Sequence, residues 1–282
     1  MSTAAPPKPA PPPPKTAMKP PGASAPAPAS NKTFSVSSGK QIRPLKVCIY
    51  GTGGIGKSEL AANIAQLGLK VLFVDADNGS AELDVHRVEG IESFSDLRAL
   101  CASDLPNQFD AVVFDTLTKI QEWSEAWTIA NIKHEKGHAV DSLEGYGFGK
   151  GIVHAYETFL MFLGDMDTLG RRGKHVITVA HECTANVPNP AGDDWIRFEP
   201  RLQSPASGKS SIRHRIKEWV DHLLYVVYDV FAKDGKAQGS GTRCIYCTEN
   251  PAYWAKSRFL SQPIVYEKGS AELWKRLLER SE

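Results

Sequence analysis

One stretch of eight residues constrains this chain more than any other. Residues 51–58 read Gly51-Thr52-Gly53-Gly54-Ile55-Gly56-Lys57-Ser58 and match the pattern G-x-x-x-x-G-K-[ST] at each specified position. A β-branched and aromatic run at residues 45–50 precedes it, and residues 59–65 have the pattern of the first turns of a helix. Glycines between a strand and a helix let several backbone N–H groups point at one anion. The stretch therefore predicts a phosphate-binding loop.

Two side chains of this loop have specific expected roles. Lys57 would reach the β- and γ-phosphates of a nucleotide, and Ser58 would hold Mg²⁺. The other loop residues, Gly51 to Gly56, would bind phosphate mainly through their backbone N–H groups. The cofactors that the loop predicts are ATP and Mg²⁺.

Carboxylates follow the next two expected strands. Residues 70–75 and 111–115 are apolar runs, and the second of them ends on Asp115. Open parallel sheets bind ligands at the carboxyl edge of their strands. Asp115 therefore fits a Walker B aspartate, which would hold the Mg²⁺ shell mostly through water because Mg²⁺ keeps much of its hydration.

The rest of the chain repeats the order of strand, loop and helix. Further strands are expected at residues 175–180, 222–230 and 243–248, and helices at residues 96–101, 119–131, 152–169 and 270–280. This alternation predicts an α/β fold with a mostly parallel sheet and helices on both faces. The fourth strand ends at His181, where many nucleotide-binding sheets place a polar residue facing the γ-phosphate. His181 is expected to sense hydrolysis, and a buried structural histidine is the alternative.

Two segments are expected to be loops. Residues 133–151 are polar and rich in glycine, which predicts a mobile surface loop whose aromatic residues either stack on bases or pack at the loop tip. Residues 184–211 are rich in Pro, Gly, Asp and Ser and predict a long irregular loop.

The first residues of the chain have a different composition. The first thirty hold eleven of the nineteen prolines and no aromatic residue, so they cannot bury enough apolar area to offset the entropy of ordering. We expect a disordered tail at residues 1–40 and one folded domain at residues 41–282. The tail could recruit a proline-reading partner or act only as a solubilising arm.

Composition also bounds the class of protein. No apolar run is long enough to cross a membrane, and five cysteines are a sparse, odd set. The one C-x-x-C, Cys244 to Cys247, lies in an expected strand without a second pair, so a metal site is not expected there. We expect a protein of the cytoplasm of a bacterium or of a phage-infected host cell.

Positive charge is concentrated although the formal net charge is only +1. No acidic residue precedes Glu59, and residues 209–217 form a block of cations without an intervening acid. This block predicts contacts with a nucleic-acid backbone, and a solvated start of a helix is the alternative. The cations are Lys209, Arg213, Arg215 and Lys217.

From Leu45 to about Glu267, the sequence resembles the phage-encoded P-loop ATPases of the RecA-core group, which include single-strand annealing proteins of phage recombination. The Walker motifs are specific only to the superfamily, and the later motifs in this order point to the group. The motifs are Tyr50-Gly51, Phe114-Asp115-Thr116-Leu117, Gly145-Tyr146-Gly147, Val179-Ala180-His181-Glu182, Lys217-Glu218-Trp219-Val220-Asp221 and Ala255-Lys256-Ser257-Arg258-Phe259.

The resemblance implies a RecA-like core, Mg²⁺-dependent ATP hydrolysis, single-stranded DNA as a partner, and a homo-oligomeric ring or filament. It also implies a catalytic base. Members of the group carry a glutamate at the end of the second strand, where this chain has Asp77, whose reach is shorter. Asp77 is therefore the expected base that positions the attacking water.

Two more cations have an expected role under this resemblance. Lys256 and Arg258 are one residue apart in a stretch expected to be extended, so both could address one anion. If subunits stack head to tail, they would act in trans on the nucleotide of a neighbour. The alternative is a surface pair balancing Glu249 or Glu267.

Two other functions stay open. The loop and residues 74–77 also resemble partitioning ATPases of the ParA and MinD type, but this chain has Thr52 where those proteins have a signature lysine, and Thr116 follows its Walker B aspartate. The third possibility is a nucleotide-binding regulatory module without turnover. An ATPase assay with and without single-stranded DNA separates the three.

Overall fold

The computed structural model describes residues 35–233 and 236–279. Most of the expected tail, residues 1–34, lies outside the described residues. The helices and strands belong to the unit of residues 42–282. In chain order they are β1 (Lys46–Gly51), α1 (Lys57–Ala62), η1 (Asn63–Leu67), β2 (Val71–Asp75), β3 (His86–Arg87), α2 (Phe94–Ala102), η2 (Leu105–Gln108), β4 (Ala111–Asp115), α3 (Leu117–Asn131), η3 (Glu144–Tyr146), α4 (Lys150–Arg171), β5 (His175–Val187), β6 (Trp195–Pro200), α5 (Ile212–Trp219), β7 (His222–Lys233), β8 (Lys236–Tyr246), β9 (Ile264–Tyr266) and α6 (Glu272–Leu278).

The strands form one mixed sheet in the order β3-β2-β4-β5-β1-β7-β8-β9, and β6 pairs with the far end of β5. The pairings from β3 to β7 are all parallel. The pairings of β8 with β7 and β9 are antiparallel. The predicted α/β fold with a mostly parallel sheet flanked by helices is confirmed.

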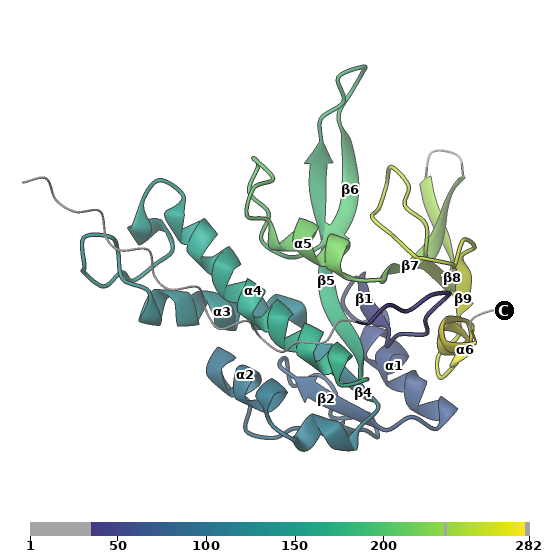
Figure 1. Ribbon diagram of the computed structural model, residues 1–282. Helices are drawn as coiled ribbons and strands as arrows, with labels where there is room; N and C mark the ends of the chain where they lie inside the picture. Colours follow the sequence, from purple (N-terminus) through teal and green to yellow (C-terminus); the bar gives the residue numbers. More distant parts are fainter. Residues whose placement is uncertain (1–34, 234–235, 280–282) are drawn as a thin grey trace, which may run out of the picture. The chain divides into compact units, whose positions relative to one another are not determined.

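Helices cover both faces of the sheet because the strand side chains alternate between two apolar layers (Figure 1). Along β1, Cys48 and Tyr50 belong to the layer that includes residues of α2, α3, α4 and α5, whereas Val47 and Ile49 belong to the layer with α1, η1 and α6. All four side chains are buried. Strands buried on both faces read as continuous apolar runs, which is why the sequence indicated them clearly.

The prediction of an irregular segment at residues 184–211 is wrong for its first part. β5 continues past His181 to Val187, and β6 returns antiparallel to it. The resulting hairpin extends beyond the neighbouring strands (Figure 1), because β1 pairs with β5 only as far as His181. The polar tip of the hairpin dominates the local composition, so the sequence pattern hid the two pairing strands on either side of it.

The prediction that residues 133–151 form a mobile surface loop is wrong for Tyr146. Tyr146 is only 2 % exposed, and its hydroxyl donates to the carbonyls of Thr128 and Ile132, at 3.0 and 2.6 Å. Both carbonyls lie at the C-terminal end of α3, where the Thr128 carbonyl also accepts from the N–H of the C-cap residue Ile132, at 2.9 Å. Phe148, two residues later, is fully exposed. The segment is therefore attached to the core through Tyr146, and of these two rings only Phe148 is accessible for stacking.

We predict that Tyr146→Phe lowers the free energy of unfolding by about 1–2 kcal/mol, because the buried hydroxyl that bonds to the carbonyls at the end of α3 is lost. Phe148→Ala serves as the matched control and should leave stability within about 0.5 kcal/mol of the parent, as expected for an exposed side chain. Urea denaturation of the three proteins measures both effects. Equal stability of Tyr146→Phe and the parent would contradict the packing of this segment.

Candidate functional site

The loop between β1 and α1 requires glycine at two positions. A Cβ atom on Gly51 would lie 2.1 Å from the carbonyl oxygen of Val226, and one on Gly56 would lie 3.0 Å from the hydroxyl of Tyr266. Gly56 also has a φ of 100°, in the left-handed region that favours glycine. By contrast, a Cβ on Gly53 would meet no atom within 4 Å. The close approach of β7 and β9 therefore shapes this loop as much as its own turns do.

Lys57 begins α1 and folds back over the loop. Its ammonium donates to the carbonyls of Gly51 and Thr52, at 3.0 and 2.8 Å, and the residue is 6 % exposed. Burial lowers the pKa of Lys57, whereas the carboxylates of Asp115 and Glu182 act in the opposite direction. The loop therefore holds a desolvated cation at its centre, with carboxylates close enough to favour its charged form.

Asp115 ends β4 and is 4 % exposed. Its pKa is raised to about 6, chiefly by burial; a hydrogen bond from the Ser58 hydroxyl opposes this rise, and the neighbouring carboxylates of Asp75 and Asp77 contribute to it. The two residues predicted to hold Mg²⁺, Ser58 and Asp115, are thus in direct contact. An acidic group buried among other acids favours either a proton or a cation beside it.

The two carboxylates at the end of β2, Asp75 and Asp77, have different surroundings. Asp75 accepts hydrogen bonds from the backbone N–H groups of Gly79 and Ser80 and from the Ser80 hydroxyl, so it holds the turn after the strand. Asp77 accepts a hydrogen bond of 2.8 Å from the Thr116 hydroxyl. Of these two carboxylates, Asp75 is engaged in hydrogen bonds with the turn after β2, whereas Asp77 is not.

His181 also lies beside Asp77, with 3.5 Å between Nε2 and the carboxylate. Burial lowers the pKa of His181, and the positive charges of Lys57 and Arg201 lower it further. The imidazole is consequently neutral at pH 7 and can donate one hydrogen bond and accept another.

These groups share one cavity of about 340 Å³. Its lining also includes Lys268, whose ammonium lies 3.8 Å from the carboxylate of Glu59. The predicted residues that line it are Gly53, Gly54, Gly56, Lys57, Ser58, Asp77, Asp115 and His181. The tertiary structure thus brings the predicted phosphate, metal and catalytic residues to one place.

Sequence reasoning missed two residues of this region. Thr116 caps α3 by accepting from the N–H of Lys119, and its hydroxyl donates to Asp77. A threonine directly before a helical pattern is a capping signal, so its first role could have been predicted. Glu182 accepts a hydrogen bond from Tyr225, and its Oε2 is buried without a hydrogen-bond partner among the described residues. Its neighbours come from β1 and β7, and the local sequence contains no sign of them.

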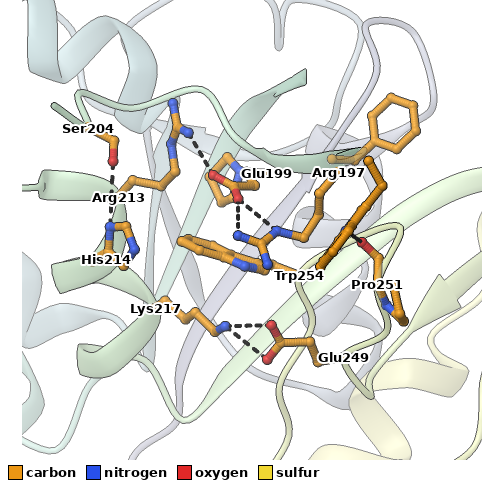
Figure 2. Close-up of polar contacts among 12 residues, drawn as sticks. Arg197, Glu199, Ser204, Arg213, His214, Lys217, Glu249, Pro251 and Trp254 are labelled. Carbon is orange, nitrogen blue, oxygen red and sulfur yellow. Dashed lines mark hydrogen bonds and ion pairs between the residues drawn. The ribbon is translucent and has the colours of Figure 1, made fainter. Parts of the chain in front are cut away.

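The predicted basic block is not a uniform positive surface. Arg213 lies 2.6 Å from the buried Glu199, which also pairs with Arg197, and the Lys217 ammonium makes two hydrogen bonds of 2.8 Å with Glu249 (Figure 2). Lys217 also lies 4.3 Å from the centre of the Trp254 ring. Two of the four predicted cations are therefore engaged with carboxylates distant in sequence.

The other two cations of the block are more accessible. Lys209 is exposed and precedes α5, and the Arg215 side chain is 46 % exposed, with Glu218 at 3.7 Å.

The last predicted pair lies far from the cavity. Lys256 bridges to Leu223 near the start of β7, and its ammonium donates to the carbonyls of Lys217 and Glu218. Arg258 pairs with Asp221 and has a side chain 65 % exposed. Because β7 is parallel to β1, this end of β7 lies at the sheet edge opposite the phosphate loop. The pair therefore cannot serve the cavity of its own chain.

We predict that Asp115→Asn raises the free energy of unfolding at about pH 8 by ~1–3 kcal/mol in metal-free buffer. The folded-state pKa of Asp115 is about 6, above the ordinary value of 3.8. The folded protein therefore binds this proton more tightly, and stability falls as the pH rises from about 4 to about 6. Replacing the charge removes that loss.

Urea denaturation from about pH 4 to 8 tests the prediction. The difference between variant and parent should grow with pH across this window, because the parent carboxylate is itself protonated at the lower end. Asp193→Asn, on the exposed hairpin tip, is the control and should show no such trend. A difference for Asp115→Asn that does not change with pH would contradict the buried charge.

The chain was compared with known families, curated sequences and solved structures. No curated protein sequence matches it. Similar solved structures include a KaiC-like protein from the hyperthermophilic archaeon Pyrococcus horikoshii, at 12 % identity and a TM-score of 0.43, covering 80 % of this chain and 86 % of that one. Another is the flagellar accessory protein FlaH from Methanocaldococcus jannaschii, at 13 % identity and a TM-score of 0.37, covering 80 % and 85 %.

The comparison with families bears directly on the site. A family model described as an AAA domain matches residues 43–259, a range that contains the phosphate loop, Asp77, Asp115 and His181. Within this range the glycine loop joins β1 to α1, and the strands from β3 to β7 are parallel. The chain belongs to this family of AAA domains.

Proposed function

We propose that this protein is a Mg²⁺-dependent ATPase that acts on single-stranded DNA, in a recombination or annealing step of the phage type, as a homo-oligomeric ring or filament. One observation carries the ATPase part of the proposal. Lys57, Ser58, Asp77, Asp115 and His181 meet in a single cavity beside a glycine loop. The family assignment supports nucleotide binding independently of that geometry.

In this proposal, Lys57 and the loop bind the triphosphate. The ammonium already lies within the loop on the carbonyls of Gly51 and Thr52, so it needs only a change of partners to reach phosphate oxygens. A desolvated ammonium attracts an anion more strongly than a hydrated one does. Lys57 would then stabilise negative charge on the β- and γ-phosphates as the bond between them breaks.

The residues present fit Mg²⁺. Ser58 and Asp115 supply oxygen ligands, which Mg²⁺ prefers, and the pKa of Asp115, raised mainly by burial, would fall beside a bound cation. No group of three or more His, Cys, Asp or Glu side chains that could hold a metal occurs in the described part of the chain. The ion would therefore take its other ligands from water and phosphate, as is usual for Mg²⁺. When bound, it would neutralise charge on the β- and γ-phosphate oxygens.

Asp77 is the proposed base that orients the attacking water. Its hydrogen bond from Thr116 and its contact with His181 restrain the carboxylate at the cavity wall. The neutral His181 would hydrogen-bond either the water or the γ-phosphate and so respond to its loss. Both roles require only that the side chains reach a water at hydrogen-bond distance.

The single-stranded DNA part of the proposal is supported by the resemblance in sequence and by the exposed cations near α5. Lys209 and Arg215 have accessible charges, whereas Arg213 and Lys217 are paired with glutamates. We therefore expect Lys209 and Arg215 to make the larger contribution to binding a phosphate backbone.

The proposed assembly is supported by the position of Lys256 and Arg258. They lie at the sheet edge opposite the phosphate loop, so head-to-tail stacking of subunits would bring this edge against the nucleotide of a neighbour. Arg258 has an exposed side chain. A cation supplied in this way stabilises transition-state charge in trans.

We predict that Lys57→Ala abolishes ATP turnover without unfolding the protein, because the ammonium points into the phosphate site and not into an apolar core. The double change Lys256→Ala and Arg258→Ala should also abolish turnover. Steady-state hydrolysis and circular dichroism measure the two effects, with Lys136→Ala, on an exposed loop, as the control. Turnover at the parent rate by folded Lys57→Ala protein would end the ATPase proposal.

Mixing the two inactive variants tests the trans role. Mixed assemblies contain some interfaces at which an intact loop meets intact cations, so part of the activity should return. If mixed assemblies form and remain inactive, the trans role of Lys256 and Arg258 is wrong.

We predict that the affinity for a single-stranded oligonucleotide falls with salt, with a logarithmic slope of roughly −0.7 per neutralised phosphate. Replacing Lys209 and Arg215 by Ala should flatten the slope by about 1.4. Replacing Arg213 and Lys217 by Ala should mainly reduce stability, because Glu199 loses a partner. A control with Lys275→Ala and Arg276→Ala removes two exposed charges from α6.

Fluorescence anisotropy in a series of salt concentrations gives the slopes. The quadruple variant should bind most weakly. If it binds as tightly as the parent and with the same slope, the basic block does not contact DNA. ATP hydrolysis without any binding of single strands would favour the partitioning alternative.

A further inference from the structure

Arg201 has a fixed backbone position beside the cavity. It directly follows β6, and its N–H donates to the carbonyl of His181 at 2.8 Å. The Thr118 hydroxyl donates to the Arg201 carbonyl at 3.3 Å and accepts from the N–H of His181 at 3.2 Å. The start of α3, β5 and the end of β6 are therefore tied together at this point. Arg201 thus lies next to a residue that lines the phosphate site.

The side chain of Arg201 differs from those of the nearest arginines. Arg197 and Arg213 both pair with Glu199. Arg201 is exposed, and its guanidinium makes no hydrogen bond or ion pair with any of the described residues. Surface arginines gain little from an ion pair, but an unpaired one remains free to bind a ligand.

The charge of Arg201 reaches the phosphate site. The guanidinium lowers the pKa of Lys57 and that of His181, so the three groups repel one another when charged. Asp77, Asp115 and Glu182 oppose this effect at Lys57. A second cation at the edge of a site that already contains a buried ammonium suits a highly charged anion, and ATP carries about four negative charges near neutral pH.

We propose that Arg201 is a further catalytic residue, which contacts the γ-phosphate of the ATP bound to its own chain. This inference rests on the proposed ATPase function. During hydrolysis, the water oxygen bonds to the γ-phosphorus while the bond from that phosphorus to the bridging oxygen breaks. The electron pair of the broken bond stays on ADP, and the proton of the water passes to inorganic phosphate or to solvent. The guanidinium stabilises the charge on the γ-phosphoryl oxygens in this step.

Arg201 and the pair Lys256 and Arg258 would act from different chains. Arg201 follows the part of β6 that is paired with β5 just past His181, at the carboxyl edge that carries the cavity. Lys256 and Arg258 lie at the opposite edge. The proposed site would therefore receive one cation in cis and others in trans, and subunit mixing distinguishes the two sources.

The variants Arg201→Ala and Arg201→Lys test the proposal, with Arg276→Ala, an exposed arginine of α6, as the control. We expect Arg201→Ala to lower kcat by about 10² to 10³, as for loss of a donor to transition-state charge. Arg201→Lys should recover part of this loss, and Arg276→Ala should equal the parent. Thermal unfolding of Arg201→Ala should match that of the parent, because the guanidinium makes no hydrogen bond or ion pair within the described part of the chain.

Nucleotide affinities provide a second readout that does not need turnover. Arg201→Ala should bind a non-hydrolysable ATP analogue about tenfold more weakly than the parent and bind ADP equally well. Equal kcat values, or an equal loss of affinity for ADP and the analogue, would overturn the role at the γ-phosphate. If the parent itself does not hydrolyse ATP, the proposed function fails, and the affinity difference alone then decides whether Arg201 contacts the γ-phosphate.

Mixing Arg201→Ala with Lys57→Ala subunits tests the cis assignment. Both changes damage the site of the chain that carries them, so no activity should return in mixed assemblies. Recovery comparable to that of the trans pair would contradict action within the same chain.

Discussion

The parallel register of β1 against its two neighbours is the constraint on which the site depends. Gly51 lies opposite His181 on β5 and Val226 on β7. On the far side of β5, Asp115 at the end of β4 lies opposite Asp75 at the end of β2. A slip of one residue would turn every side chain of a strand to the other face. Both faces of these strands are buried, so two apolar layers hold the register. The phosphate loop, the carboxylates and the histidine consequently reach the same edge of the sheet.

The three carboxylates at this edge of the sheet differ in their hydrogen bonds and in their burial, and these differences give them different roles. Asp75 is occupied by the turn after β2, Asp77 is restrained by Thr116, and Asp115 is the most deeply buried of the three. Desolvation disfavours the ionised form of Asp115 and the protonated form of Lys57. Burying these two charges is thus electrostatically costly to the fold, and a phosphate with its cation would relieve that cost for both residues at once.

The polar contacts of α5 illustrate why a run of like charges in a sequence is a weak guide to a surface. Arg213 and Lys217 pair with Glu199 on β6 and with Glu249 after β8, and Trp254 lies between the two pairs (Figure 2). These contacts join α5 to the hairpin that begins beside His181. The buried charge of Glu199 needs both of its arginine partners, because a buried charge without a partner is strongly destabilising. These arginines therefore stabilise the fold and are not free to bind a ligand.

The phosphate loop, Asp115 and the α/β class could be predicted from the sequence because their determinants are local: a glycine pattern, apolar runs and the residues that follow them. The burial of Tyr146, the pairing of Arg213 with Glu199 and the position of Arg201 beside His181 could not. Each joins segments separated by a loop or a hairpin, and local patterns carry no information about which distant group will be the partner. The tertiary structure decided them, because strand register and packing determine which polar groups meet and which charge remains unpaired.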